Sequence, residues 1–251
     1  MFEVNGNSGS QFFSGEDGLR VANGSVVTRR SGLLHGTAVL TDRGWRPVEK
    51  IVAGDLVRTL DHDFQQVAST EREVLALPDD GLSEENRPVR VPAGSVFNKR
   101  PLWLMPEQGM LVDCDAVSEF ADDRQAVISA RLLKGVCGIA SGLPGARLGL
   151  ATLSFATDEV IYVEGGMMAY CPSMATKRWT SGAANKKGYA VLSGAQAEGV
   201  AKQLARLNDA TTLASPLGEL PTAIPNKPVL PVRPVNVDRR PGRPGRPKPL
   251  A

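Results

Sequence analysis

The sequence predicts an all-β fold with one helix near its C-terminal end, followed by an extended proline-rich tail. Three observations lead to this prediction. Short runs rich in Val, Ile and Leu recur through the middle of the chain, and turn-forming residues rather than long helical windows separate them. One amphipathic helical pattern follows these runs, and ten of the eighteen prolines fall after residue 215. With 251 residues, 42% of them hydrophobic, the chain can bury a large core.

The candidate strands are short, apolar and bounded by turn signals at residues 42–44, 53–55 and 78–81. Gly, Asp and Pro in these turns interrupt each run before it becomes long enough for a helix. Residues 1–31 are richer in Gly, Ser and Asn, and we expect a lead-in segment there with an edge strand near Val26. The predicted strands cover residues 38–41, 56–60, 89–91, 110–112, 126–130 and 160–163.

A helix is predicted to begin at Ser193. Ser193 and Gln196 have the spacing of a capping box, in which two side chains satisfy backbone N–H groups at the start of a helix. An apolar face then recurs at helical spacing, formed by Val200, Ala201, Leu204 and Leu207, and we expect it to be buried. The folded domain is therefore predicted to span residues 32–213 and to end after this helix.

Residues 214–251 are predicted to form a separate basic tail. Proline fixes φ and lacks a backbone N–H, so this segment favours an extended, polyproline-like conformation. Residues 221–251 carry seven basic side chains and one acidic one, although the whole chain has a net charge of only +2. We expect apolar and basic residues of this tail to bind a partner, namely Val229, Leu230, Val232, Arg239, Arg240, Arg243, Arg246 and Lys248.

Three hypotheses for the tail remain open at this point. It is a flexible linker, or a proline-rich segment that docks on another protein, or a nucleic-acid contact. The Gly-Arg-Pro repeats resemble minor-groove AT hooks, in which arginines flank a narrow groove. However, the Arg-Gly-Arg-Pro core of that motif is absent because proline replaces the first arginine.

The sequence predicts neither a metal nor a cofactor. The three cysteines form no C-x-x-C pair and only two histidines could assist them, so a zinc site is not expected. The odd number of cysteines also argues against a disulfide framework. We expect Cys114, Cys137 and Cys171 to be small buried residues, and His35 and His62 to be partly exposed turn residues.

Other features give no site and no membrane segment. The acidic cluster of Asp113, Asp115, Asp122 and Asp123 has a spacing that matches no calcium loop, so we expect a solvated surface. No apolar run approaches the roughly 18 residues that cross a bilayer. The first seven residues lack the features of a Sec signal peptide, which leaves the cytoplasm or export by another route as the expectation.

Residues 36–57 are the most informative part of the chain. A strand that begins at Gly36 and Thr37 reverses at residues 42–44, Val48 and Ile51 face inward, and the chain turns again into a second strand. The order of G-T-x-[VIL], a turn, P-V-E-x-[IL] and x-x-G-D-x-V resembles the opening of bacterial Hint (hedgehog/intein) domains. Weaker matches follow at residues 61–67, 87–95, 104–112 and 155–165. The resemblance covers about residues 32–210 and implies a Hint-type β fold.

The resemblance also implies where self-processing chemistry would lie. A Cys or Ser at the first position of such domains attacks the preceding carbonyl, while a later S/T-x-x-H block supplies a hydroxyl and a proton-donating His. The alignment places Gly32 at the nucleophile, Met105 at the hydroxyl, Gln108 at the His, and Asp158 at a second His. Glycine cannot attack and a neutral amide does not transfer protons. Ser31 lies one residue out of register, which reverses a side chain's direction in a strand.

We therefore expect that the chain is not an enzyme and has lost autoprocessing. Its predicted role is a non-catalytic structural or interaction protein that docks on a protein partner or larger assembly through the tail. Two alternatives stay open: a self-processing Hint protein that cleaves near residue 31, and a nucleic-acid-associated protein that acts through its basic tail.

Overall fold

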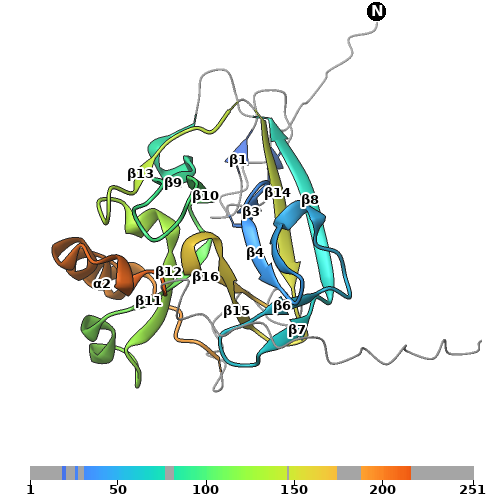
Figure 1. The fold of residues 1–251 in the computed structure, drawn as a ribbon. Coiled ribbons are helices and arrows are strands. Elements are labelled where there is room, and N and C mark those ends of the chain that lie inside the picture. The colour runs from blue at the N-terminus through green and yellow to red at the C-terminus, as the bar shows by residue number, and fades with distance from the viewer. Residues whose placement is uncertain are drawn as a thin grey trace, which may run out of the picture.

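The computed structural model describes residues 19–20, 26–27, 31–76, 82–145, 147–173 and 188–215. These residues form mainly antiparallel strands with short 3-10 turns and one α-helix, α2 (Gly194–Leu207), which confirms the all-β prediction (Figure 1). The binding residues predicted in the tail, from Val229 to Lys248, lie outside the described residues. Within the described part, no helix is long and apolar enough to cross a membrane.

Two large sheets build the domain. The first follows the order β13 (Ala140–Ser141), β9 (Val89–Val91), β10 (Leu102–Leu104), β3 (Leu33–Leu34), β14 (Arg147–Ser154), β8 (Ser69–Ala76). The second follows β12 (Gln125–Ser129), β11 (Gly109–Asp113), β16 (Met167–Cys171), β15 (Glu159–Val163), β4 (Ala38–Thr41), β6 (Leu56–Arg58), β7 (Phe64–Gln66), with β5 (Gly44–Pro47) on β4. A separate pair joins β1 (Leu19–Arg20) to β2 (Val26–Val27).

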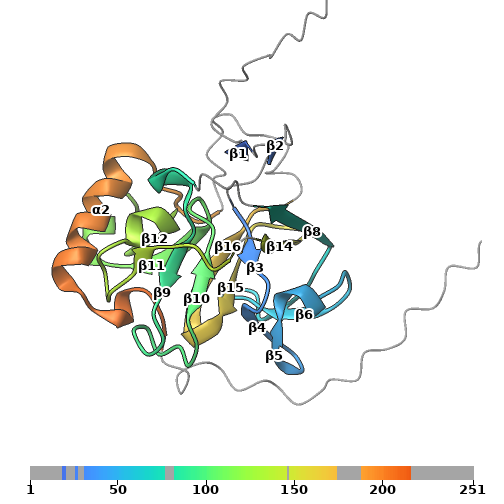
Figure 2. The ribbon, with the colours of Figure 1, turned by 90° about the horizontal axis from the view of Figure 1, so that it is seen from above.

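The main core lies between these two sheets. Leu33 and Leu153 contribute from the first sheet, and Ile161 and Val163 contribute from the second, each with at most 2% of its surface exposed. Both views place α2 beside β11 and β12 at one end of the domain, and β6 at the other (Figures 1 and 2). Because strands from distant parts of the sequence alternate in each sheet, positions far apart in the chain meet at the sheet centres.

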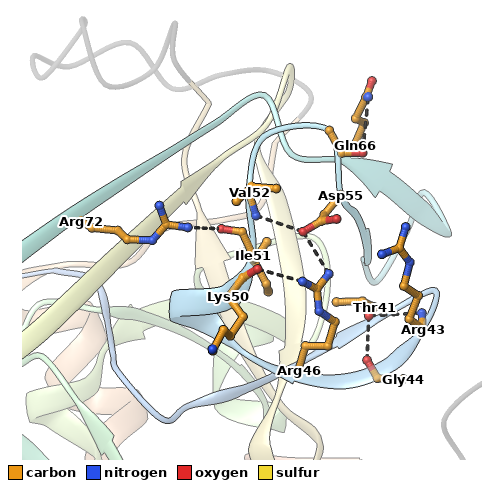
Figure 3. Close-up of polar contacts among 11 residues, drawn as sticks. Thr41, Arg43, Gly44, Arg46, Lys50, Ile51, Val52, Asp55, Gln66 and Arg72 are labelled. Atoms are coloured by element: carbon orange, nitrogen blue, oxygen red, sulfur yellow. Dashed lines mark hydrogen bonds and ion pairs between the residues drawn. The ribbon is translucent and has the colours of Figure 1, made fainter. Parts of the chain in front are cut away.

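The informative segment of residues 36–57 folds as its pattern predicts. Strands β4 and β5 pair around a tight turn in which the Thr41 hydroxyl donates to the Gly44 carbonyl at 2.7 Å (Figure 3). Val48 lies in the 3-10 turn η1 (Val48–Lys50), and its side chain and that of Ile51 are fully buried. Gly44 has φ of +88°, a conformation that glycine adopts without strain.

Asp55 organises the turn into β6. Its carboxylate accepts the Val52 N–H at 3.0 Å and pairs with the Arg46 guanidinium at 3.0 Å (Figure 3). From β8, Arg72 donates to the Ile51 carbonyl at 2.6 Å. The Gly-Asp pair of the motif therefore has a structural role, since it closes the loop between the two strands that carry the resemblance.

The six predicted strands are present, with small differences in their ends. The strand expected over residues 56–60 stops at Arg58, and Thr59 instead forms an isolated bridge with Ile161. The sequence prediction missed the strands β8, β10, β14 and β16 and the two-residue strands β3 and β13. Strand β14 contains Gly149 and small residues, and β8 is rich in charge, so neither shows clear alternation; their eight paired residues stabilise each other.

Helix α2 begins after Ser193 as predicted, but two details of that prediction are wrong. The Ser193 side chain makes no capping hydrogen bond, so the capping box does not form. Leu207 is 50% exposed, and Ala197 is buried with Val200 and Leu204 instead. The buried face of the helix consists of Ala197, Val200 and Leu204, and α2 packs on the 3-10 turns η3 (Asp115–Glu119) and η4 (Ala130–Leu133).

Candidate functional site

Gly32 and Gln108 meet at the centre of the domain. Gly32 directly precedes β3, and Gln108 directly precedes β11 in the other sheet. The backbone N–H of Gly32 donates to Oε1 of Gln108 at 3.0 Å, and the contact is buried although 76 residues separate the two positions. The structure therefore brings together the two positions that the sequence comparison assigned to the nucleophile and the histidine.

Both the oxygen and the nitrogen of the Gln108 side-chain amide form hydrogen bonds. Besides the bond from Gly32, its Nε2 donates to the carbonyl oxygens of Gly109 at 3.0 Å and Tyr170 at 2.9 Å. Only 5% of Gln108 is exposed. One side chain thus satisfies three backbone groups on three chain segments, and a buried backbone group without such a partner would cost about 1–3 kcal/mol.

A cleft of about 440 Å³ opens beside this bond. Its walls combine apolar side chains from both sheets with a few polar groups, and Ser31 lies at its rim. Val191, at the mouth, is 59% exposed. The side chains that set its character are Leu33, Ile128, Leu153, Thr152, Tyr170 and Cys171.

Gly32 has a backbone conformation that other residues rarely adopt. Its φ is +130°, and a Cβ at this position would lie 3.3 Å from the Thr152 hydroxyl and 3.5 Å from the Ala151 carbonyl. A side chain here would be strained by the backbone and crowded by the neighbouring strand. The position therefore lacks a nucleophile and also disfavours the introduction of one.

Met105 does not face the cleft. Its side chain is 1% exposed and belongs to a small apolar cluster with Leu34, Leu148 and Leu150. The link to Gln108 runs through the backbone, because the Met105 carbonyl accepts the Gln108 N–H at 3.0 Å. The predicted hydroxyl position thus contributes packing and a turn, and it adds no group to the cleft.

Asp158 holds Tyr170, a side chain that lines the cleft. Its carboxylate accepts the Tyr170 hydroxyl at 2.9 Å and the Ser173 N–H at 2.7 Å. Burial, and then the neighbouring Asp158 carboxylate, raise the pKa of the Tyr170 phenol, so this side chain remains neutral and donates its proton. Tyr170 also packs edge-on against Tyr189, with ring centroids 6.2 Å apart.

The other residues singled out from the sequence have mixed outcomes. Cys114 and Cys171 are buried as expected, whereas Cys137 is only partly buried. His35 is an exposed turn residue as expected. His62 is 54% exposed but contacts the buried carboxylate of Glu159, a partner that the sequence did not reveal.

The acidic cluster is solvated. Arg124 pairs with Asp113 and Asp115, and Asp122 and Asp123 are exposed. Across the described residues, no group of His, Cys, Asp and Glu has an arrangement that could hold a metal ion.

Sequence reasoning missed Thr152 and Tyr170, which shape the cleft. Thr152 lies in β14, a strand that was not predicted, and Tyr170 lies in β16, which was also missed. A further strand after residue 163 could have been inferred from Met167 to Cys171, a short apolar run that follows two glycines.

The chain is similar to solved structures of intein-like proteins. A solved bacterial intein-like domain from Clostridium thermocellum is similar, with 11% identity, a TM-score of 0.40, and coverage of 56% of this chain and 98% of that one. The MchDnaB-1 intein is also similar, with 13% identity, a TM-score of 0.32, and coverage of 55% and 98%. A comparison with curated protein sequences gave no match. The family model for the Hint domain matches residues 31–170, more than half of the chain, and the chain therefore belongs to the Hint domain family.

Proposed function

We propose that this protein is a non-catalytic Hint domain that serves as a structural or interaction module. The observation that carries the proposal is the set of bonds made by Gln108. At the position assigned to a proton-donating histidine, a neutral amide satisfies Gly32, Gly109 and Tyr170. An amide has no useful pKa for proton transfer, and its bonds are directed to the fold rather than to a substrate.

The other assigned positions support the same proposal. Gly32 offers no attacking group, and its positive φ disfavours any residue that would supply one. Met105 is buried among leucines, and Asp158 is engaged with Tyr170 and Ser173. In each case the residue present stabilises the β-scaffold, which fits a chain that keeps the Hint fold without its chemistry.

The alternative of cleavage near residue 31 would require a nucleophile and a base at positions other than those that the family resemblance assigns. Ser31 lies at the rim of the cleft and is the candidate nucleophile. A serine hydroxyl needs a base within hydrogen-bond reach, and the described residues that line the cleft include no histidine. The carboxylate of Glu107, which also lines it, is engaged by Ser129 and Arg131.

The interaction half of the proposal assigns three parts to the chain: a lead-in segment of residues 1–31, the Hint domain of residues 32–213, and a docking tail of residues 214–251. The first two residues of that tail, Ala214 and Ser215, pack on the domain, so the docking role falls to the residues after them. The tail combines apolar residues between prolines with a basic end, a composition that suits an extended segment on a partner with an acidic groove. Because proline restricts the free chain, its ordering on a partner costs less entropy than for an average segment.

Affinity capture from the native cell tests the interaction role. Three bait proteins are compared by quantitative mass spectrometry: the full chain, a variant with Val229, Leu230 and Val232 changed to Ser, and a variant with Arg239, Arg240, Arg243, Arg246 and Lys248 changed to Ser. The proposal expects a protein partner that both variants lose. Capture of the same proteins by all three baits would contradict it. Nucleic acid that binds in a salt-dependent manner and is lost only with the basic residues would favour the nucleic-acid alternative.

A further inference from the structure

Glu159 is a buried carboxylate with an exposed histidine as its partner. It is the first residue of β15 and is 1% exposed. Nδ1 of His62 lies 3.1 and 3.0 Å from its two oxygens, and the Thr157 hydroxyl donates to Oε1 at 2.7 Å. Burial of a charged carboxylate costs free energy unless a cation or several hydrogen bonds compensate it. The cost of burying Glu159 therefore depends on whether the His62 imidazole is protonated.

His62 closes a loop onto the sheet. It lies between β6 and β7, at the far edge of the second sheet. Within the loop, the Thr59 N–H donates to the Asp63 carbonyl at 2.7 Å, and the His62 N–H donates to the Thr59 hydroxyl at 3.2 Å. The Leu60 N–H donates to the Val160 carbonyl at 2.8 Å. The His62–Glu159 contact adds a charged side-chain link to the backbone hydrogen bond that joins Leu60 of the loop to Val160 of β15.

The neighbouring charges do not replace His62. Arg58 pairs with Asp63 and stacks over Phe64, with its guanidinium 5.3 Å from the ring centroid. Asp61 accepts the Tyr189 hydroxyl at 2.5 Å and adds negative charge near the imidazole. Across the strand pair, Cys171 lies opposite Glu159. Among the described residues, His62 is the cationic side chain that forms an ion pair with Glu159.

We propose that His62 and Glu159 form a proton-controlled latch that fastens the β6–β7 loop to β15, closed when the imidazole is charged and weakened when it loses its proton. The exposed face of the imidazole ring exchanges protons with solvent. Each change in the charge of the ring alters the strength of its ion pair with the buried Glu159 carboxylate. The neutral ring can still donate a hydrogen bond, so loss of the proton loosens the loop without releasing it.

The direction of the pH response follows from the contacts. The hydrogen bond to Glu159 and the charge of that carboxylate raise the pKa of His62 above its ordinary value, and partial desolvation opposes this only in part. A raised pKa in the folded state means that the latch contributes fully below the unfolded value of about 6.5. Its contribution is lost as the pH rises through the higher folded value.

Nuclear magnetic resonance tests this latch directly, because the chain contains only two histidines. The ring protons of His62 and His35 are titrated, with a His35→Gln variant to assign them. We expect His62 to titrate above about 6.5, and Glu159→Gln to return it towards that value while His35 is unchanged. A midpoint for His62 at or below the ordinary value would overturn the proposal.

Amide hydrogen exchange tests the mechanical part. In the wild-type chain, protection factors for residues 59–66 should fall about twofold as the pH rises through the midpoint of His62. In His62→Gln the same amides should show no such step, and in His35→Gln they should behave as in the wild type. If Glu159→Gln does not fold, the titration of His62 in the wild-type chain and the hydrogen exchange of His62→Gln still test the proposal. A step of equal size in His62→Gln would show that the loop responds to another group.

Discussion

The backbone N–H of Gly32 donates to the side-chain oxygen of Gln108 at 3.0 Å, and this buried bond links the entry to β3 with the entry to β11. It joins the two sheets at the point where the Hint family resemblance places a nucleophile beside a histidine. A catalytic pair needs a nucleophile and a positioned side chain that can give up and regain a proton. Here the same two positions form a fixed contact whose groups are all satisfied, so the site has the features of a structural junction.

Removal of the Gln108 amide should destabilise the fold strongly. In Gln108→Leu, the Gly32 N–H and the carbonyls of Gly109 and Tyr170 lose their partner in a buried environment. We expect a loss of about 3 kcal/mol in the free energy of unfolding by urea. Gln66→Leu is the control, because its exposed amide makes one long contact of 3.5 Å; it should change stability by about 0.5 kcal/mol at most. Equal effects of the two substitutions would contradict the assigned role.

A side chain at position 32 should be tolerated less well than one at position 36. Both glycines have positive φ, +130° for Gly32 and +88° for Gly36, but only at Gly32 would a Cβ approach other atoms. Gly36→Ser should cost about 1–2 kcal/mol through backbone strain alone. Gly32→Ser should exceed this, because the new Cβ would also lie 3.3 Å from the Thr152 hydroxyl, closer than an ordinary contact. A Gly32→Ser protein as stable as the wild type would show that the position accepts a nucleophile.

The stability of the protein should depend on pH through His62. The pKa of His62 is raised in the folded state, so the stabilisation is complete below about pH 6.5 and disappears as the pH rises through the folded value. We expect the free energy of unfolding of wild type to exceed that of His62→Gln at pH 6, and the gap to close by about pH 9. The gap should be on the order of 0.5 kcal/mol, since solvent screens a half-exposed pair. A gap that is constant or grows with pH would be inconsistent with the latch.

The folded unit should be independent of the tail if the chain is cut after Ser215. The Ser215 N–H donates to the Gly166 carbonyl at 3.1 Å, Ala214 bridges to Met167, and Leu213 is fully buried. Deletion of residues 216–251 should keep the melting temperature within a few degrees. Deletion from residue 210 removes the buried Leu213 and Ala214 and should cost about 2–4 kcal/mol. A large loss from the first deletion would mean that the tail packs on the domain.

Much of the fold could be predicted because local sequence patterns agree with the strand ends and the burial seen in the folded domain. The turns at residues 42–44 and 53–55 fix the strands on either side, and Val48 and Ile51 are buried as their spacing requires. Strands β8 and β14 could not be predicted in this way. Their eight-residue pairing is a long-range contact, and sequences with charge or glycine gain a strand conformation only from the partner.

The candidate site shows the same division. The absence of a nucleophile at Gly32 follows from the residue type, but its contact with Gln108 depends on how the two sheets cross. The contact between His62 and Glu159 joins positions 97 residues apart, so the sequence pattern around either residue could not predict it. The helix prediction failed in its details for a related reason: Ser193 fits a capping box by spacing, but its side chain does not make the bond.

Intact mass spectrometry shows whether the chain processes itself. The full chain is kept for days at neutral pH, with and without a thiol that would intercept an ester formed by the Ser31 hydroxyl on the Arg30 carbonyl. Because Gly32 has no side chain and Gln108 is fixed by three hydrogen bonds, we expect one full-length species under both conditions. A fragment that begins at Ser31 or Gly32, or one released only by thiol, would contradict it.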